Sequence, residues 1–261
     1  MKAKFYTVLT SLVLLVSFFC QANENIVSVG VAHFPPYSIV EGEVISGVEV
    51  EIIRESLSIM GYQTKFISYP YGRLPLSFSS KLVDSTIVTL KNFSDIAVFY
   101  SDIVLPEYQT VAVHLEKNNL KVEAISDLEN TSVLAHQRAH LFYGGEYKRI
   151  AEVNKETLIY RETARQEAQV RMLFSDRVDV IVLAHEIFMY FKSKAEYAER
   201  DEKHTVSKIF GGKFGFHNVF WDKKVRDDFN IGLATIKENG AYHNILTKYL
   251  QVYELNSQVI K

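Results

Sequence analysis

The segment that most constrains the fold reads VDVIVLA and occupies residues 178–184. Every residue in it except Asp179 is apolar, and the run is too short for an ordinary helix. A strand with one face in water alternates polar and apolar side chains, whereas this run is unbroken. It therefore predicts a parallel strand buried on both faces, as in α/β proteins that have helices on both sides of a sheet.

Strand and helix patterns alternate along much of the remaining chain. Apolar runs bounded by turn residues predict strands at residues 26–32, 64–70, 82–88, 95–100, 109–115, 131–135 and 156–161. Apolar residues at helical spacing predict helices at residues 48–60, 73–82, 163–176, 222–239 and 241–250. The expected fold class is therefore α/β, with mainly parallel sheets flanked by helices.

The first 22 residues have the pattern of a secretory signal peptide that is removed from the mature protein. Lys2 and Lys4 precede an apolar run at residues 8–19, and the segment ends at Ala22. The run is short for a membrane span, and no later stretch reaches the roughly 18 apolar residues that a span needs. A lipoprotein signal with an acylated Cys20 is the alternative, but the bulky residue before it disfavours that processing. We expect cleavage after Ala22 and a periplasmic protein.

Loss of the signal peptide limits the chemistry of the mature chain. Cys20 is the single cysteine, so we expect no disulfide bond. Removing two lysines changes the formal net charge from −2 to −4, and the lack of a basic excess argues against nucleic-acid binding. His136 and His140 have the spacing of metal ligands on a helix, but no carboxylate nearby completes a set. No G-x-S-x-G motif occurs, and we expect no metal, no cofactor and no catalytic residues.

Phe34, Pro35, Pro36 and Tyr37 directly follow the first predicted strand. Ligands of α/β sheets bind beyond the carboxyl ends of strands, so this loop lies where a ligand is expected. Prolines restrict the loop, and rings held on a stiff loop form an apolar wall with little ordering cost on binding. The other interpretation is a turn whose rings merely cover the core, and the residues alone favour neither.

Six segments of the chain resemble, in the same order, the bacterial extracellular solute-binding protein family 3, which includes periplasmic amino-acid receptors of ABC transporters. They read VGVAHFPPYSIVEGEVISGVEVEIIRESLSIMGY, LVDSTIV, YSDIVLPEYQTVAV, ISDLENTSVLAH, SDRVDVIVLAHEIFMYF and IKENGAYHNILTKY. The first resembles the family's opening strand, proline-aromatic loop and first helix, and the last resembles its terminal helix. Each segment is weak alone, but their common order covers nearly all of the mature chain.

This resemblance implies a two-lobed type II periplasmic binding fold, in which each lobe is a mainly parallel sheet flanked by helices and the ligand lies between the lobes. Lobe one is expected at residues 23–112 and 213–261, and lobe two at residues 113–212. Two crossing hinge strands, QTVAVHL and GKFGFHNVF, would join them. Glycines near the second crossing either give hinge freedom or form a simple turn, and the sequence leaves both open; they are Gly211, Gly212 and Gly215.

The residues with which amino-acid receptors of this family hold a zwitterion are missing. The family has an arginine that follows a threonine and grips the ligand carboxylate; here Thr89 is present, but Lys91 is the nearest cation. Ala184 stands where many relatives have a carboxylate for the ligand ammonium, and HQRAH replaces the glycine-serine or glycine-threonine turn of lobe two. The resemblance with these departures implies a ligand other than a standard α-amino acid in the usual clamp.

Other residues at strand ends are predicted to replace the clamp. Arg73 follows the strand at residues 64–70, where a subgroup of the family has a comparable arginine, and Tyr71 beside it is expected to form a second aromatic face. Gln137 and Arg138 are expected at a helix N-terminus, where backbone N–H groups would add to anion binding. Solvent-exposed roles for both arginines stay open. The predicted ligand-binding residues are Phe34, Tyr37, Tyr71, Arg73, Thr89, Lys91, Gln137 and Arg138.

The expected function is that of a monomeric periplasmic receptor. It closes on a small polar or anionic solute with a flat or apolar body and delivers the solute to an inner-membrane ABC permease. Two alternatives stay open. One is a dehydratase-like enzyme on the same fold, with Glu41, Glu43 or Glu186 as the nearest acids. The other is a soluble partner that presents the ligand to a membrane sensor.

Overall fold

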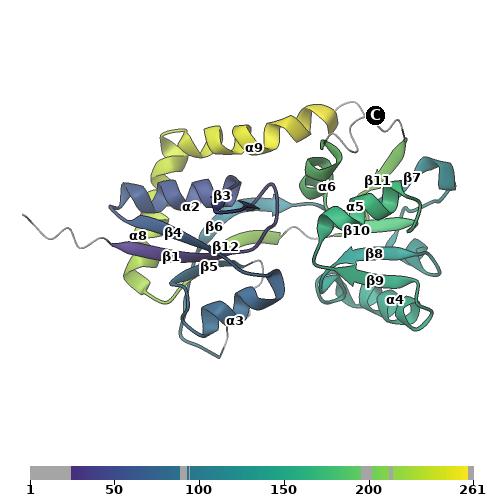
Figure 1. Cartoon of the computed structure of the whole chain (residues 1–261), viewed down its shortest axis with the longest axis horizontal. Coiled ribbons are helices and arrows are strands. Elements are labelled where there is room, and N and C mark those ends of the chain that lie inside the picture. The colour runs from purple at the N-terminus through teal and green to yellow at the C-terminus, as the bar shows by residue number, and fades with distance from the viewer. Residues whose placement is uncertain (1–24, 89–92, 94, 195–201, 212–213, 258–261) are drawn as a thin grey trace, which may run out of the picture.

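The computed structural model describes residues 25–88, 93, 95–194, 202–211 and 214–257, which form two lobes side by side (Figure 1). The predicted signal peptide, Thr89 and Lys91 lie outside the described residues. A search of the described helices for one long and apolar enough to cross a membrane finds none.

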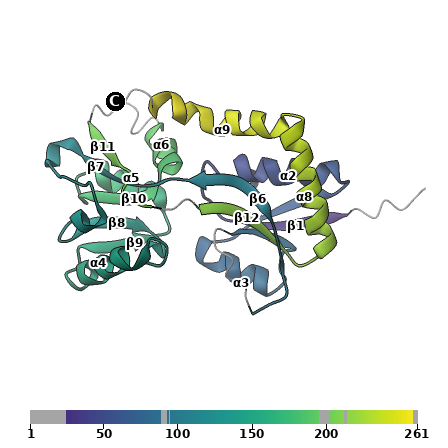
Figure 2. The same cartoon turned by 180° about the vertical axis from the view of Figure 1, so that it is seen from behind.

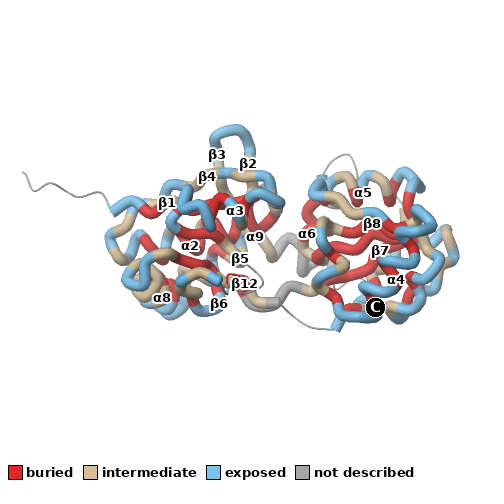
Figure 3. The backbone as a smooth tube through the Cα atoms, turned by 90° about the horizontal axis from the view of Figure 1, so that it is seen from below, coloured by how far each residue is buried: buried red, intermediate tan, exposed pale blue. Residues whose placement is uncertain are grey.

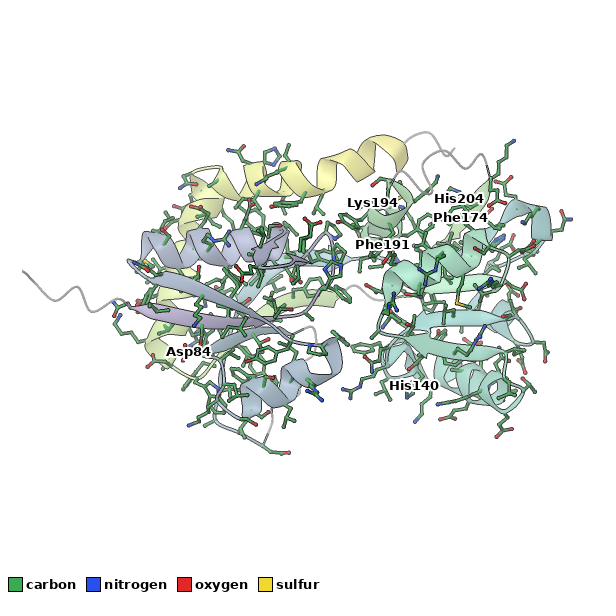
Figure 4. All side chains as sticks on the ribbon, viewed as in Figure 1. Asp84, His140, Phe174, Phe191, Lys194 and His204 are labelled. Atoms are coloured by element: carbon green, nitrogen blue, oxygen red, sulfur yellow. The ribbon has the colours of Figure 1, made fainter. Side chains whose placement is uncertain are left out.

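Lobe one is built on a sheet with the strand order β4-β1-β5-β12-β6. These strands are β1 (Ile26–Val31), β4 (Gln63–Ser68), β5 (Ser85–Val88), β6 (Phe99–Tyr108) and β12 (Phe214–Phe220). β1 pairs in parallel with β4 and β5, whereas β12 runs antiparallel to both β5 and β6. Asp84 connects the turn before β5 to β1, because its carboxylate accepts hydrogen bonds from the Ser28 N–H at 2.8 Å and the Ser28 hydroxyl at 2.5 Å (Figure 4).

Helices cover both faces of this sheet. They are α2 (Val48–Ile59), α3 (Leu74–Ser79), α8 (Lys223–Glu238) and α9 (Ala241–Ser257), and a short hairpin of β2 (Ile39–Glu41) and β3 (Val44–Ser46) precedes α2. α2 and α9 lie on one side of the sheet and α3 on the other (Figure 1). The apolar residues predicted to share one face of α2, such as Ile52, Ile53 and Leu57, are fully buried, and Gly61 follows the helix with a left-handed backbone. The helical spacing in the sequence therefore gave the correct core face.

Lobe two is built on a second sheet, with the strand order β11-β7-β10-β8-β9. Its strands are β7 (Thr110–Leu115), β8 (Val133–His136), β9 (Tyr160–Thr163), β10 (Val180–Ala184) and β11 (His204–Ser207). Its helices are α4 (Gly144–Glu156), α5 (Gln166–Phe174) and α6 (His185–Lys192), with 3₁₀ turns η2 (Glu116–Asn118), η3 (Ile125–Leu128) and η4 (Ala139–Leu141).

The central strand β10 is buried on both faces. Val180 and Val182 belong to an apolar cluster with Ile150 of α4, while Ile181 belongs to a different cluster with Leu173 of α5. The strand is parallel to β8 and antiparallel to β7. Figure 3 shows the buried positions concentrated along the sheets of the two lobes. The prediction of a strand covered on both faces is confirmed, and the predicted parallel pairing holds on its β8 side.

The chain passes twice between the two sheets. β6 of lobe one leads into β7 of lobe two with one residue between them, and β11 of lobe two is followed by β12 of lobe one (Figure 2). The α/β fold of two mixed, mainly parallel sheets flanked by helices is the predicted one. The exact lobe boundaries and the hinge role of the glycines stay predictions.

Several local predictions differ from the structure. The helix expected at residues 73–82 is a 3₁₀ turn, η1 (Tyr71–Arg73), followed by the short α3, and the strand expected at residues 95–100 begins only at Phe99. The sequence pattern also did not predict α4, which ends at Glu156, and the strand expected at residues 156–161 is observed as β9 at Tyr160–Thr163. The apolar face of α4 includes a fully buried Asn154, whose amide donates to the Leu128 carbonyl at 2.8 Å. A polar residue at a core position interrupts the helical pattern.

Candidate ligand-binding cleft between the lobes

A cavity of about 160 Å³ lies between the lobes and is lined by both. It lies where β1 and β5 of lobe one and β8 and β10 of lobe two end, as expected for an α/β binding site. Lobe one contributes Val31, Ala32, Phe34, Ser38, Glu49, Tyr71, Gly72, Leu74, Pro75, Thr86, Ile87 and Phe216. Lobe two contributes His136, Arg138, Leu141, Phe142, Tyr143, Gln166 and Ala184. The space is large enough for several waters or one small solute.

The Phe34–Tyr37 loop combines the two interpretations that its sequence allows. Phe34 lines the cavity and stacks on Tyr71, with ring centroids 5.8 Å apart and an interplanar angle of 14°. Tyr37 does not line the cavity; it is buried behind Phe34 and packs on Phe216, with centroids 5.2 Å apart. Phe34 and Tyr71 therefore form one continuous wall on lobe one rather than two facing walls.

The same loop fixes the start of α2. The Pro36 and Tyr37 carbonyls accept hydrogen bonds from the N–H groups of Val48 and Glu49, at 3.1 and 3.0 Å. Gly47 allows this close approach, because its φ is +118° and a Cβ there would lie 2.4 Å from the Tyr37 carbonyl oxygen. The loop thus satisfies helix N-terminal donors and places the first turn of α2, with Glu49, at the cavity.

Several residues that line the cavity were not among the predicted ligand-binding residues, and Glu49 is the acidic one. Glu49 lines the cavity, is only 4% exposed, and its buried Oε1 has no hydrogen-bond partner among the described residues. Burial raises the pKa of its carboxyl to about 8, so the acid is mostly protonated at neutral pH in this arrangement. It can donate a hydrogen bond when protonated or bind a cation when ionised.

His136 and Tyr143 form a neutral polar part of the lobe-two wall. The Nδ1 of His136 lies 3.1 Å from the Gln137 carbonyl, so Nδ1 carries the proton and Nε2 accepts from the Tyr143 hydroxyl at 2.5 Å. The Thr110 hydroxyl in turn donates to the Tyr143 oxygen at 3.1 Å. Burial lowers the pKa of His136 to about 4 and raises the pKa of Tyr143, so both side chains are neutral at pH 7.

His136 and His140, whose spacing resembles that of metal ligands on a helix, bond to different partners. His136 lies on β8 and bonds to Tyr143, whereas His140 lies in η4 and bonds to Glu162 at 2.7 Å (Figure 4). Burial acts to raise the pKa of Glu162, but hydrogen bonds from His140, Tyr160 and the Arg138 backbone lower it overall. A search of the described residues for a group of side chains able to hold a metal ion finds none.

Arg138 lines the cavity, but not from a long helix. It has a left-handed backbone with φ of 67° and precedes the three-residue turn η4, while α4 begins only at Gly144. Arg138 therefore lies at the N-terminus of a three-residue 3₁₀ turn and not of an α-helix. Its guanidinium charge acts to lower the pKa of Tyr71, although burial raises that pKa overall. Arg138 lines the same cavity as the aromatic wall of the opposite lobe.

The remaining predicted residues occupy different positions. Gln137 approaches lobe one, since its side-chain nitrogen would lie 3.6 Å from a Cβ on Gly72. Arg73 is exposed at the end of η1 and is not among the residues that line the cavity. Ala184, at the end of β10, does line it. The ligand-binding roles of these residues, and of Thr89 and Lys91 outside the described part, stay predictions.

One hydrogen bond connects the lobes directly beside the cavity. The Tyr37 hydroxyl of lobe one donates to the Glu186 carboxylate in the first turn of α6, at 3.1 Å. Together with the approach of Gln137 to Gly72, this contact shows that the described structure is one in which the lobes are in contact.

Two α/β lobes, joined by two chain crossings around a cavity, define the type II class of periplasmic binding proteins. Residues 27–252 match the family model for bacterial extracellular solute-binding proteins, family 3. An arginine-binding periplasmic protein of Mannheimia haemolytica is 25% identical over 231 residues, which cover 83% of this chain and 87% of that protein.

Solved structures agree on the fold. The substrate-binding protein of an amino acid ABC transporter is 16% identical, with a TM-score of 0.65 over 87% of this chain and 99% of that one. A histidine kinase sensor domain with similarity to periplasmic binding proteins is 17% identical, with a TM-score of 0.69 over 88% of this chain and 98% of that one. The chain belongs to the bacterial extracellular solute-binding proteins, family 3. The prediction of a small-molecule binding protein rather than an enzyme is confirmed by this family.

Proposed function

We propose that this protein is a periplasmic receptor that closes on a small organic solute and delivers it to an inner-membrane ABC permease. The observation that carries this proposal is the cavity between the lobes, with the stacked rings of Phe34 and Tyr71 on one side and Phe142 and Arg138 on the other. A ligand that contacts both walls stabilises the closed arrangement of the lobes, as a hinged receptor requires.

The chemistry of the cavity supports a solute with a flat or apolar body and an anionic end. Stacked aromatic rings favour a flat body, and the Arg138 guanidinium favours a carboxylate or similar group. Ala184 lines the cavity at the place where many relatives have an ammonium-binding carboxylate, so this contact of the usual amino-acid clamp is not available from β10. We therefore propose that the ligand is held differently from a standard α-amino acid.

The predicted signal peptide supports delivery to the periplasm, and the named relative is itself a periplasmic protein. The similarity to the binding protein of an amino acid ABC transporter supports a permease as the partner. The fold also serves in a histidine kinase sensor domain, so presentation of the ligand to a membrane sensor is the second candidate. Transport of radiolabelled ligand into cells with and without this protein separates the two.

Thermal-shift screening of organic acids, aromatic acids, amino acids and short peptides tests the receptor proposal. A ligand at 100 times its dissociation constant is expected to stabilise the protein by about 2.7 kcal/mol. Phe34→Ala and Arg138→Gln are expected to weaken each hit about tenfold or more, because each removes a direct contact. Arg73→Gln is the matched control, since Arg73 is exposed and does not line the cavity.

Small-angle scattering with each hit should show a more compact particle than without it. Tight binding that is insensitive to Phe34→Ala and leaves the particle shape unchanged would overturn the receptor mechanism. A greater loss of affinity in Arg73→Gln than in Arg138→Gln would assign the anchor to Arg73, as the sequence pattern suggests.

A further inference from the structure

Glu49 is a buried group in the cavity wall to which the proposed function gives no role. It is more than nine-tenths buried, it lines the cavity, and its Oε1 has no hydrogen-bond partner among the residues that the structure describes. Buried polar atoms in proteins are nearly always paired, and one that is not requires an explanation such as a bound water, an ion or a ligand. The cavity is the place where a partner can enter.

The carboxyl does not serve the fold as a helix cap. The start of α2 has no side-chain cap, and the Pro36 and Tyr37 carbonyls already accept from the N–H groups of Val48 and Glu49. Glu51, two residues later, differs because it bonds to Lys248 at 2.7 Å and to Tyr249. Of these two acids in the first turn, Glu51 has a partner within the protein and Glu49 is the one that lines the cavity.

We propose that Glu49 binds a positively charged nitrogen of the solute, such as an amine or a guanidine. This inference rests on the proposed receptor function and names the class of its ligand. With Arg138 it describes a clamp with the carboxylate on lobe one and the arginine on lobe two. That is the reverse of the expected family arrangement, in which the arginine belongs to lobe one and the carboxylate to the end of β10.

Charge balance favours a cation over a second anionic group. A solute that is anionic at both ends would meet Arg138 at one end and an acid at the other, whereas a zwitterion meets a complementary group at each end. Arrival of a cation also favours the ionised carboxylate, so Glu49 releases its proton when such a solute binds. A solute that accepts a hydrogen bond from the neutral acid would release none.

Proton release at neutral pH can be attributed to Glu49. The other titratable or charged side chains known to line the cavity are Tyr71, His136, Arg138 and Tyr143. Burial keeps the pKa of His136 near 4 and raises the pKa values of both tyrosines, and arginine stays charged. The pKa of Glu49, about 8, is the one close to neutrality.

The test compares matched pairs of solutes that differ in one cationic nitrogen. The pairs are L-arginine with L-citrulline, 4-(aminomethyl)benzoate with 4-(hydroxymethyl)benzoate, and benzylamine with benzyl alcohol. Affinity and proton release are measured by titration calorimetry at pH 7 in two buffers of different ionisation enthalpy. In at least one pair, the cationic member is expected to bind about tenfold or more tightly, with release of about 0.9 proton for a pKa of about 8.

Glu49→Gln is expected to reduce this preference to less than about threefold and to abolish the proton release. Glu51→Gln is the matched control and should keep both, because Glu51 bonds to α9. The inference is overturned if no pair shows a preference for the cationic member, or if Glu49→Gln keeps it. The measurements on the unmodified protein decide the question even if Glu49→Gln fails to fold.

The receptor proposal can hold even if Glu49 does not bind a cation, because the receptor proposal is tested with a broader set of solutes. Binding of anionic or neutral compounds that is lost in Phe34→Ala leaves the receptor function standing while the role of Glu49 is rejected. The receptor function itself fails if compounds from the broad screen bind tightly, are insensitive to Phe34→Ala and leave the particle shape unchanged.

Discussion

Replacing Glu49 by glutamine should change how the stability of the protein depends on pH. Glutamine has nearly the same shape as glutamic acid and does not titrate. The ordinary pKa of this carboxyl is 4.5, and burial in the folded protein raises it to about 8. Between these values the folded form holds a proton that the unfolded form has released, so the contribution of Glu49 to stability falls as the pH rises.

The size of the effect follows from the two pKa values. At pH values well between the unfolded and folded pKa values, each unit by which the pH rises lowers the unfolding free energy by about 1.4 kcal/mol. From pH 5.5 to 7.0 the native protein should therefore lose about 2 kcal/mol through Glu49, and Glu49→Gln should lose none of this amount. For a protein of this size, 2 kcal/mol corresponds to about 4–8 °C in the melting temperature.

Urea denaturation at several pH values between 5.5 and 7.0 measures this difference. The quantity of interest is the unfolding free energy of Glu49→Gln minus that of the native protein, since other titrating groups contribute equally to both. This difference should rise by about 2 kcal/mol across the range, while Glu51→Gln should show no such rise, because Glu51 has partners in α9. A constant difference would refute the reasoning and would mean that water reaches Glu49 in the empty protein.

Two further predictions concern the loop and the contact between the lobes. Tyr37→Phe removes the hydroxyl that donates to Glu186 at 3.1 Å. We expect calorimetry to show that the affinity for a ligand falls about tenfold, with little change in the melting temperature of the empty protein. Unchanged affinity would show that this bond does not hold the lobes together. Gly47→Ala should destabilise the protein by more than about 3 kcal/mol in urea denaturation, because a Cβ there meets the Tyr37 carbonyl at 2.4 Å with φ at +118°. Gly42→Ala, with φ at +62° and open space around it, should cost only about 1 kcal/mol in the same assay. Equal losses of stability in the two variants would contradict the importance of the contact with Tyr37.

The sequence predicted those parts of the fold in which pattern and environment agree. The unbroken apolar run of β10 predicted a strand covered on both faces, and Val180 and Ile181 indeed contact different apolar clusters. The sequence did not predict α4, because the amide of Asn154 occupies a core position and bonds to backbone carbonyls of a neighbouring turn. A polar side chain satisfied by a distant segment cannot be recognised from local periodicity.

The sequence predicted part of the site, because it indicates which residues follow a strand but not where their side chains point. Strand ends and prolines located the loop of Phe34, and the resemblance to the family located Arg138 near the cavity. Arg73 also follows a strand, but the chain enters a 3₁₀ turn there and leaves this side chain exposed. Position along a strand defines which edge of the sheet a residue occupies, whereas the turn that follows decides where its side chain points.

The position of Glu49 on the apolar face of a predicted helix is a sequence signal for the site that is independent of strand ends. Glu49 and Glu51 lie two residues apart on α2, which places them on nearly opposite sides of the helix. Glu49 precedes the buried Ile52 and Ile53 by three and four residues and therefore belongs to the apolar face. An ionisable residue in the apolar face of a helix must have a buried partner, a shifted pKa or a ligand. In the first turn of a helix that begins at a ligand-binding edge, the ligand is the partner to test first.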